Sequence, residues 1–195
     1  MKLRHINTLL LVCIIGINGA IITLPFVPSL VFWAQSRDPG RVSQLEAKIT
    51  AAAKDTTQQK TTATEDNRLI IPRMMLDEAI HTGPTARTLR DGLWLRPQGD
   101  TPDNASNTVI VGHRFTYTDP QGTFYHLDKV RLGDRIAVWW EGKQHTYTVS
   151  DIKTVQADQT SIEAPTKHGQ LTLYTCTPLW LPKDRLVVIA TEDMP

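Results

Sequence analysis

The most prominent pattern in the sequence is a long apolar run near the N-terminus. Residues 6–36 carry no charged side chain, and residues 9–34 are apolar for about 25 positions, which is enough for a helix to cross the hydrocarbon layer of a bilayer. Lys2 and Arg4 precede the run, so the positive-inside bias favours a cytoplasmic N-terminus. We therefore expect residues 1–34 to form a cytoplasmic tip and a single-pass anchor in the cell membrane, with the rest of the chain extracellular.

A cleaved signal peptide would also contain an apolar run, but its apolar core spans roughly 7 to 15 residues and ends at a small-x-small site. The run here is longer, and Phe32, Trp33 and Ala34 offer no such site. This favours an uncleaved anchor. Pro25 and Pro28 would interrupt an ideal helix, so we expect the outer third of the anchor to be kinked or to lie at the membrane interface.

The pattern changes after the anchor. Residues 35–67 are rich in Thr, Gln, Ala, Lys and Asp and contain almost no large apolar side chain after Ile49. Such a segment cannot bury a core, so it predicts an extracellular stalk or linker. The pattern allows a short helix over 42–54, with Leu45 and Ile49 on one face, and we interpret that helix as a spacer. A lid over an active site would need an aromatic or acidic anchor motif, and residues 56–66 supply none.

Residues 68–195 show short β-branched runs between clusters of Gly, Pro, Asn and Asp. This punctuation is typical of an all-β barrel or sandwich. Two runs form a predicted hairpin, because Gly142 lies in a short polar break between them. We expect the aromatic side chains of this hairpin to pack in the core or on the sheet. The candidate strands are residues 68–71, 107–112, 135–140, 144–155, 169–175 and 185–191.

Composition and charge exclude several classes of function. The chain has 195 residues, a net charge of +1 and a pI near 7.8, so nothing indicates a nucleic-acid partner. It contains no HExxH, paired CxxC, P-loop, GxGxxG or GxSxG motif, so the sequence gives no support for a metal ion or a nucleotide cofactor. The settings of Cys13 and Cys176 differ so much that we expect no disulfide between them.

Cys176 is the residue that stands out chemically, because it ends the alternating run LTLYTC. The competing interpretation is a buried cysteine that acts as a small hydrophobe. A thiol becomes a useful nucleophile where an imidazole or a guanidinium favours the thiolate. The candidates are His113, at the end of TVIVGHR after a glycine that allows a tight turn, and Arg185, which opens RLVVIAT. We expect the three side chains to converge at one rim of the barrel.

Other side chains compete for these two roles. Arg114, beside the candidate histidine, is the main alternative to Arg185. We expect the remaining histidines of the domain to lie at the surface or in packing contacts, because they occur in the hairpin, in an expected turn or beside loop glycines. These histidines are His81, His126, His145 and His168.

The candidate residues lie in segments that resemble a known family. TLYTC, at 172–176, matches the TLxTC signature of the sortases, the cysteine transpeptidases of Gram-positive-type cell surfaces. VIVGHR, at 109–114, resembles the sortase segment with the catalytic histidine, and DRLVVIAT, at 184–191, resembles the strand with the catalytic arginine. Further similarity lies in LIIPRMMLDEAI, at 69–80, and FYHLDKVRLGDRI, at 124–136. The resemblance therefore covers nearly the whole folded domain, in the order His, Cys, Arg.

The resemblance implies an all-β fold: an eight-stranded sortase-type β-barrel with short helices, preceded by a transmembrane helix and a polar stalk. It implies that Cys176 is the nucleophile, that His113 is the general acid/base, and that Arg185 holds substrate and stabilises the oxyanion. Thr175 would help to form the oxyanion site. No cofactor or metal ion is implied.

The implied reaction cleaves an LPxTG-like sorting signal on a secreted protein through a Cys thioacyl intermediate. The protein is then transferred to a cell-wall precursor or another amine acceptor. We expect a housekeeping-like enzyme, because the chain stops at Pro195 without a second membrane span and the stalk contains no lid motif.

Two alternatives stay open: a pilin-polymerising sortase, and a non-catalytic, membrane-tethered domain that binds peptides. The spacing from Cys176 to Arg185 resembles both the pilin class and several housekeeping-like classes. An L,D-transpeptidase or an NlpC/P60-like hydrolase fits less well, because Cys176 ends a strand and follows His113 in the chain.

Overall fold

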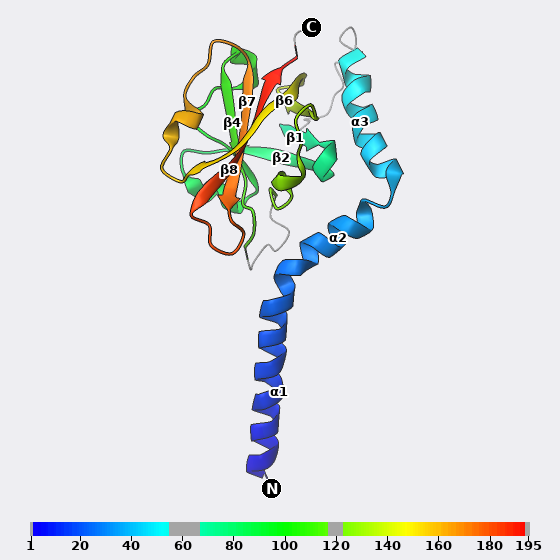
Figure 1. The fold of residues 1–195 in the computed structure, drawn as a ribbon, viewed down its shortest axis with the longest axis vertical. Helices are drawn as coiled ribbons and strands as arrows, with labels where there is room; N and C mark the ends of the chain where they lie inside the picture. Colours follow the sequence, from blue (N-terminus) through cyan, green and yellow to red (C-terminus); the bar gives the residue numbers. More distant parts are fainter. Residues whose placement is uncertain (1, 55–66, 117–122, 194–195) are drawn as a thin grey trace.

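The structure, a computed structural model, describes residues 2–54, 67–116 and 123–193. Its centre is a closed barrel of eight strands in the order β1-β2-β3-β4-β7-β8-β6-β5 (Figure 1). The strands are β1 Arg68–Ile71, β2 Leu76–Thr82, β3 Leu93–Leu95, β4 Asn107–Val111, β5 Arg135–Trp140, β6 Lys143–Gln156, β7 Gln170–Thr177 and β8 Asp184–Glu192. The predicted eight-stranded barrel, preceded by an apolar helix, is confirmed. Residues 56–66, in which we found no lid motif, lie outside the described part of the chain.

Six of the strands coincide with the candidate runs, and β2 and β3 were missed. In β2, only Leu76 and Ile80 are buried. These residues are four apart, and polar or charged side chains surround them, so the sequence does not show the alternation of a strand. β3 has three residues, all buried, which is too short a run to show a period.

The barrel closes around side chains from one face of each strand. On β7, Leu171 and Leu173 are fully buried in a core that also contains Ile136 and Val188. β4 and β7 pair in parallel, although 58 residues separate the end of one from the start of the other. This parallel pair matters for the site, because both strands end at the same edge of the barrel.

The predicted hairpin is formed by β5 and β6, which pair antiparallel from Trp140–Lys143 to Arg135–Thr148. Its loop is shorter than the sequence pattern indicated. Glu141 and Gly142 form the turn with φ angles of 47° and 80°, and two successive positive φ angles are the signature of a tight turn that matches the twist of the strands.

The apolar N-terminal run forms two helices that meet at an angle (Figure 1). α1 spans Lys2–Thr23, a 3-10 helix spans Leu24–Phe26, and α2 spans Val27–Gln35. The 3-10 helix contains Pro25, which cannot donate a backbone hydrogen bond, so the expected break in the anchor is present. The stretch Arg4–Gln35 is apolar enough to be a candidate membrane span, and its most apolar part is almost entirely exposed.

A third helix, α3, spans Pro39–Lys54 and lies along the side of the barrel (Figure 1). Ile49 is 1% exposed and packs on Ile70 and Ala137 of the sheet. Gln144 also donates its side-chain N–H to the carbonyl oxygen of Ile49 at 2.8 Å. The helical pattern around Leu45 and Ile49 therefore forms a docking face, which differs from the spacer role that we expected.

Candidate active site

Cys176 and Arg185 lie side by side where β7 and β8 meet the loop between them. The antiparallel register pairs these two residues directly, because the intervening loop returns the chain along the neighbouring strand. Arg185 Nη1 donates to Cys176 Sγ at 3.5 Å. The contact that we expected between these two side chains is therefore present.

His113 follows β4 at the same edge of the barrel. The last parallel pair of β4 and β7 is Val111 with Tyr174, and Gly112 N–H continues the ladder to the Tyr174 carbonyl at 3.4 Å. The pairing ends there, and continuing its register by two residues would place His113 opposite Cys176. The His113 carbonyl accepts a hydrogen bond from Phe124 N–H at 3.0 Å, which holds the backbone of the histidine in place.

Gly112 is required for close packing rather than for a turn. Its φ is not in the left-handed region, which differs from the tight turn that we expected there. A Cβ on this residue would lie 2.5 Å from Thr123 Oγ1 and 2.9 Å from the Phe124 ring. The residue before His113 must therefore lack a side chain.

Cys176 is reachable by solvent. Leu171, Leu173 and Thr175 alternate toward the interior of the barrel, and Cys176 lies on the opposite face with an intermediate exposure. The sulfur is therefore not the buried hydrophobe of the competing interpretation. Cys13 is also a free thiol and is exposed on α1, so the expectation that the two cysteines do not pair is confirmed.

The hydroxyl of Thr175 is already engaged inside the barrel. Thr175 is 1% exposed, and its Oγ1 donates to the Gly112 carbonyl at 2.8 Å. A hydroxyl carries a single donor hydrogen, so in this arrangement the side chain has none to offer an oxyanion. The contact instead links the strand that bears Cys176 to the residue before His113.

Arg114 holds the start of the loop between β7 and β8. Its Nη1 donates to Thr177 Oγ1 at 2.8 Å, and its Nη2 lies 3.7 Å from Asp128 Oδ1. The side chain is 14% exposed. The guanidinium that hydrogen-bonds to the Cys176 sulfur is that of Arg185, so the geometry favours Arg185 over Arg114 for that position.

A half-buried polar cluster adjoins this face of the barrel, and the sequence analysis missed it. Tyr174 OH donates to Glu163, whose carboxylate also accepts two hydrogen bonds from Arg96, at 2.9 and 3.1 Å. Burial and the Glu163 carboxylate raise the pKa of Tyr174, so its hydroxyl stays protonated. The available signal was the period of two in TLYTC, which puts Tyr174 on the same face of β7 as Cys176.

The histidines that we expected at the surface or in packing contacts include two with clear structural partners. His145 Nδ1 lies 2.9 Å from Glu192 Oε1 within the β6–β8 region. The His126 ring stacks on Phe32 of α2 with 4.2 Å between the ring centroids. Both contacts are structural. Among the described residues, no group of three or more His, Cys, Asp or Glu side chains could hold a metal ion.

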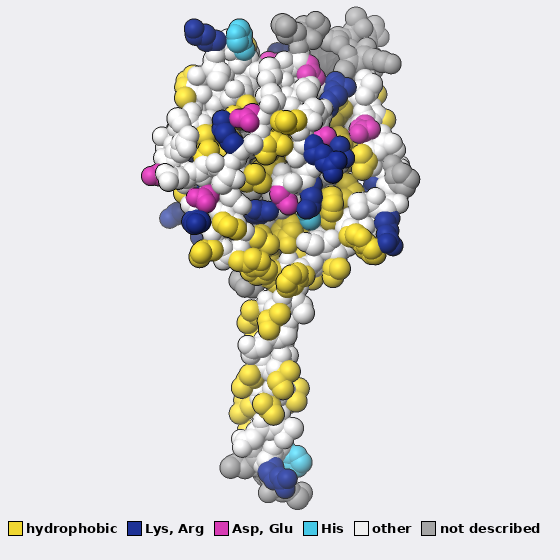
Figure 2. Space-filling model, in the orientation of Figure 1, with side chains coloured by type: hydrophobic (Ala, Val, Ile, Leu, Met, Phe, Trp, Pro, Cys, Tyr) yellow, Lys and Arg dark blue, Asp and Glu magenta, His cyan; other side chains and the backbone are white. Residues whose placement is uncertain are grey.

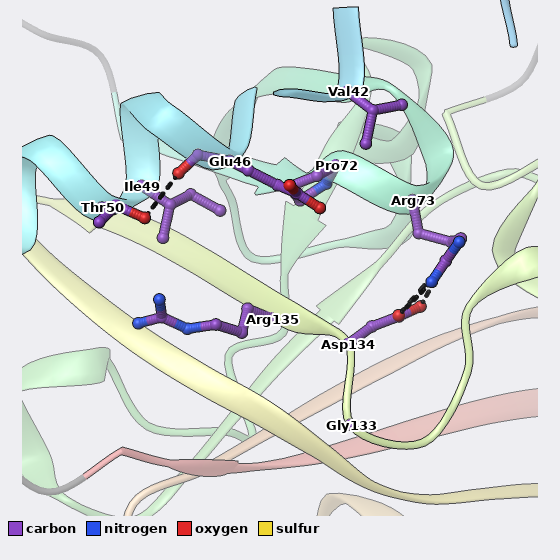
Figure 3. A pocket seen from close by; sticks show the side chains of 9 residues that line it. All are labelled: Val42, Glu46, Ile49, Thr50, Pro72, Arg73, Gly133, Asp134 and Arg135. Carbon is purple, nitrogen blue, oxygen red and sulfur yellow. Dashed lines mark hydrogen bonds and ion pairs between the residues drawn. The ribbon is translucent and has the colours of Figure 1, made fainter. Parts of the chain in front are cut away.

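Two hollows lie along the helices that pack on the barrel. One hollow, of about 270 Å³, lies between α3 and the barrel (Figure 3). In its lining, Arg73 and Asp134 form an ion pair of 2.9 Å. The other, of about 300 Å³, lies between α2 and β2 and includes Phe32 and His126. Neither is lined by Cys176 or the two side chains proposed to act with it, so we place the candidate active site at the strand edge itself.

The comparisons with known proteins agree with the fold. A family model described as the Sortase domain matches residues 69–193. The chain is similar to the solved structure of Streptococcus agalactiae sortase C1 in complex with MTSET, with 26% identity, a TM-score of 0.59 and coverage of 81% of this chain and 93% of that one. Among curated proteins, no sequence matches the chain.

Two more distant structures share the fold. Sortase C-1 from Actinomyces oris is 22% identical, with a TM-score of 0.61 and coverage of 79% of this chain and 99% of that one. Listeria monocytogenes sortase A is 22% identical, with a TM-score of 0.60 and coverage of 66% of this chain and 86% of that one. The similarity therefore includes proteins named sortase C and sortase A, and it does not separate these subclasses.

Proposed function

The chain belongs to the sortase family of transpeptidases, and from this premise we propose that it cleaves an LPxTG-like sorting signal and transfers the acyl fragment, N-terminal to the cut bond, to a cell-wall amine. The observation that carries the proposal is the 3.5 Å contact of Arg185 Nη1 with Cys176 Sγ at a solvent-reached strand edge. The proposed catalytic residues are Cys176, His113 and Arg185.

The first half of the proposed reaction acylates the enzyme. The Cys176 thiolate attacks the scissile carbonyl carbon, a C–S bond forms, and the carbonyl oxygen becomes an oxyanion. His113, protonated at the start, gives its proton to the nitrogen of the breaking amide, so the amine leaves neutral. A thioacyl enzyme remains on the sulfur.

In the second half of the reaction, His113 accepts a proton and Cys176 becomes the leaving group. An incoming amine gives a proton to the now neutral His113 and attacks the thioester carbonyl. The C–S bond breaks, and Cys176 leaves as the thiolate. Because each half uses the same sulfur and the same imidazole, no metal ion or cofactor enters the proposed reaction.

Arg185 is suited to the oxyanion because its guanidinium is always charged and presents several N–H donors in one plane. The antiparallel pairing of Cys176 with Arg185 keeps those donors beside the carbon under attack. We assign Thr175 a positioning role, because its hydroxyl is bound to the Gly112 carbonyl.

We propose that the apolar helix α1 anchors the protein in the membrane, with the N-terminus cytoplasmic and the barrel outside. This proposal rests on the candidate span Arg4–Gln35 and on the basic residues that precede it. The partners are then secreted proteins that carry a sorting signal, together with an amine of the cell wall or its precursor.

We favour a housekeeping-like role in surface-protein anchoring over pilin polymerisation. The second candidate has a specific observation in its favour, because the similar solved structures include sortase C1 of a pilus island. Offering the enzyme both an amine of the cell-wall type and a lysine-bearing pilin peptide distinguishes the two. Exclusive use of the lysine side chain would replace our preferred assignment by the second.

The central experiment detects the thioacyl intermediate. The full chain in detergent is incubated with an LPxTG-type peptide library and analysed by mass spectrometry. We expect an acyl adduct on Cys176, and a transpeptidation product once an amine is added. Cys176→Ala removes both, whereas Cys13→Ala provides a matched control that keeps them, because Cys13 is exposed on α1.

An adduct that survives Cys176→Ala would contradict the assignment of the nucleophile. Absence of both adduct and product across the library, with peptide binding retained, would favour the non-catalytic binding domain instead. The His113→Ala variant completes the test, because we expect it to abolish turnover while the fold is preserved.

A further inference from the structure

The loop between β7 and β8 is apolar at its exposed tip. Trp180 is 59% exposed and Leu181 is 69% exposed. This loop joins the strand of Cys176 to the strand of Arg185 and lies at the end of the barrel nearest α1 (Figure 1). Adjacent exposed apolar side chains of this size mark an interaction surface more often than isolated ones do.

The tip of this loop is continuous with the candidate membrane span. Trp180 packs against Phe26, at the junction of α1 and α2, with 5.9 Å between the ring centroids. Trp180 also contacts Phe115, with 6.4 Å between the centroids. Phe26 itself is 55% exposed. Apolar side chains gather at the base of the barrel where it meets the long helix (Figure 2).

The length of α1 fixes the level at which these aromatic rings lie. α1 spans Lys2–Thr23, and the part after its basic residues, 6–23, is roughly 27 Å long at about 1.5 Å per residue. The hydrocarbon core of a bilayer is about 30 Å thick, so this part of α1 is close to the length needed to cross it. The turn that contains Pro25 and Phe26 then lies at the membrane surface, the layer in which tryptophan side chains are enriched.

A direct hydrogen bond holds the barrel close to the Pro25–Phe26 turn, and so close to the membrane surface. Tyr125 OH donates to the Pro25 carbonyl at 2.7 Å in a buried hydrogen bond, and the 3-10 turn is therefore tied to the barrel directly. If the barrel is held at this end of α1, the apolar tip of the β7–β8 loop lies against the lipid.

We propose that the β7–β8 loop is a second membrane contact, in which Trp180 and Leu181 insert into the interfacial layer of the lipid bilayer beside Phe26. This inference rests on the proposed anchoring by α1. Because the loop connects Cys176 to Arg185, the contact turns the edge of the barrel with the candidate nucleophile toward the bilayer. A peptide presented close to the membrane surface is then within its reach.

Fluorescence quenching tests the contact. The full chain is reconstituted into phosphatidylcholine vesicles whose acyl chains carry bromine at a shallow or a deep position. Trp33→Phe removes the other exposed tryptophan of the candidate span. Of the remaining tryptophans, Trp94 and Trp140 are 3% and 5% exposed, and Trp139 is partly buried in the contact between α3 and the barrel. We expect this variant to be quenched, more by shallow than by deep bromine, and we expect Trp33→Phe/Trp180→Phe to lose that quenching.

A matched pair of variants probes the neighbouring leucine. Leu181 and Leu132 are similarly exposed, at 69% and 66%, but Leu132 adjoins the residues that line the α3 hollow. In the Trp33→Phe background, Leu181→Ser should weaken the quenching of Trp180, and Leu132→Ser should leave it unchanged. Circular dichroism checks that each variant is folded.

The outcomes separate this inference from the proposals on which it depends. If the chain floats with the vesicles but Trp180→Phe leaves the quenching unchanged, the loop does not touch lipid and the inference is overturned. If the chain does not float, the anchor fails and the inference fails with it. Binding of a protein or peptide to Trp180 without lipid quenching would identify the loop as a protein-docking surface. The thioacyl assay in detergent reports on the enzyme independently.

Discussion

At the residue scale, we expect that a lysine cannot replace Arg185 beside Cys176. Arg185→Lys keeps the positive charge but replaces a planar set of donors with one compact ammonium group. We expect kcat/KM for a sorting-signal peptide to fall roughly 100- to 1,000-fold, because one oxyanion donor contributes about 3 to 4 kcal/mol to the barrier. Steady-state kinetics with a quenched fluorescent peptide measures the change.

The control for this experiment is Arg73→Ala. Arg73 pairs with Asp134 in the hollow under α3, away from the candidate active site, so this variant should retain its activity. Wild-type activity of Arg185→Lys would show that the position requires charge alone. Such a result would remove the planar-donor argument and would leave Cys176 and His113 in their proposed roles.

The residue scale also shows what the sequence could predict about the site. The proposal of Cys176, His113 and Arg185 as catalytic residues came from a motif and its order along the chain. The bond from Thr175 Oγ1 to the Gly112 carbonyl could not be predicted, because the two residues are 63 positions apart and depend on the register of a parallel strand pair. The same holds for Tyr174, whose partner Glu163 lies in the β6–β7 connection.

At the element scale, strands were predictable where the burial pattern was visible. β6 and β8 are long and rich in β-branched residues, whereas β2 buries two side chains four residues apart and resembles a helix in sequence. α3 shows the converse. The spacing of Leu45 and Ile49 predicted the apolar face of α3. The polar composition of the segment gave no sign that this face packs on Ile70 and Ala137 of the barrel.

Ion pairs at the contact between α3 and the barrel should make the free energy of unfolding decrease at low pH. Burial alone would raise the pKa of Asp77, but hydrogen bonds and charges from Lys48 and Arg68 outweigh it and hold this pKa below its ordinary value of 3.8. The pairs of Asp77 therefore contribute fully above about pH 3.8, and the contribution is lost as the pH falls through the lowered pKa.

Asp77→Asn tests this dependence. At neutral pH we expect a loss on the order of 1 kcal/mol in the free energy of unfolding, with a smaller difference from wild type at pH 3. Denaturant unfolding at both pH values measures it. Asp151→Asn, at an exposed pair with Lys153, is the matched control and should change little. A constant difference between wild type and Asp77→Asn at both pH values would contradict the ion-pair argument.

At the scale of the whole molecule, the barrel and the apolar helices act as one body because α2 docks on the loop before β5. The hydrogen bond from Tyr125 OH to the Pro25 carbonyl holds one end of this contact. His126 holds the other, since its Nε2 lies 3.3 Å from the Pro28 carbonyl and its ring stacks on Phe32. The orientation of the candidate active site relative to α1 therefore depends on a histidine.

That dependence makes the docking of α2 sensitive to pH. Burial lowers the pKa of His126 below its ordinary value of 6.5, with Lys129 and Arg114 acting in the same direction and the Pro28 carbonyl and Asp128 opposing. The docked state thus binds fewer protons than the undocked one, so docking is strongest above about pH 6.5 and weakens as the pH falls toward the lowered pKa.

Hydrogen exchange of the α2 amides, corrected for its intrinsic pH dependence, should show less protection at pH 5.5 than at pH 7.5. His126→Gln, which cannot titrate, should show no such difference, and an equal loss of protection in both proteins would rule out His126 as its cause.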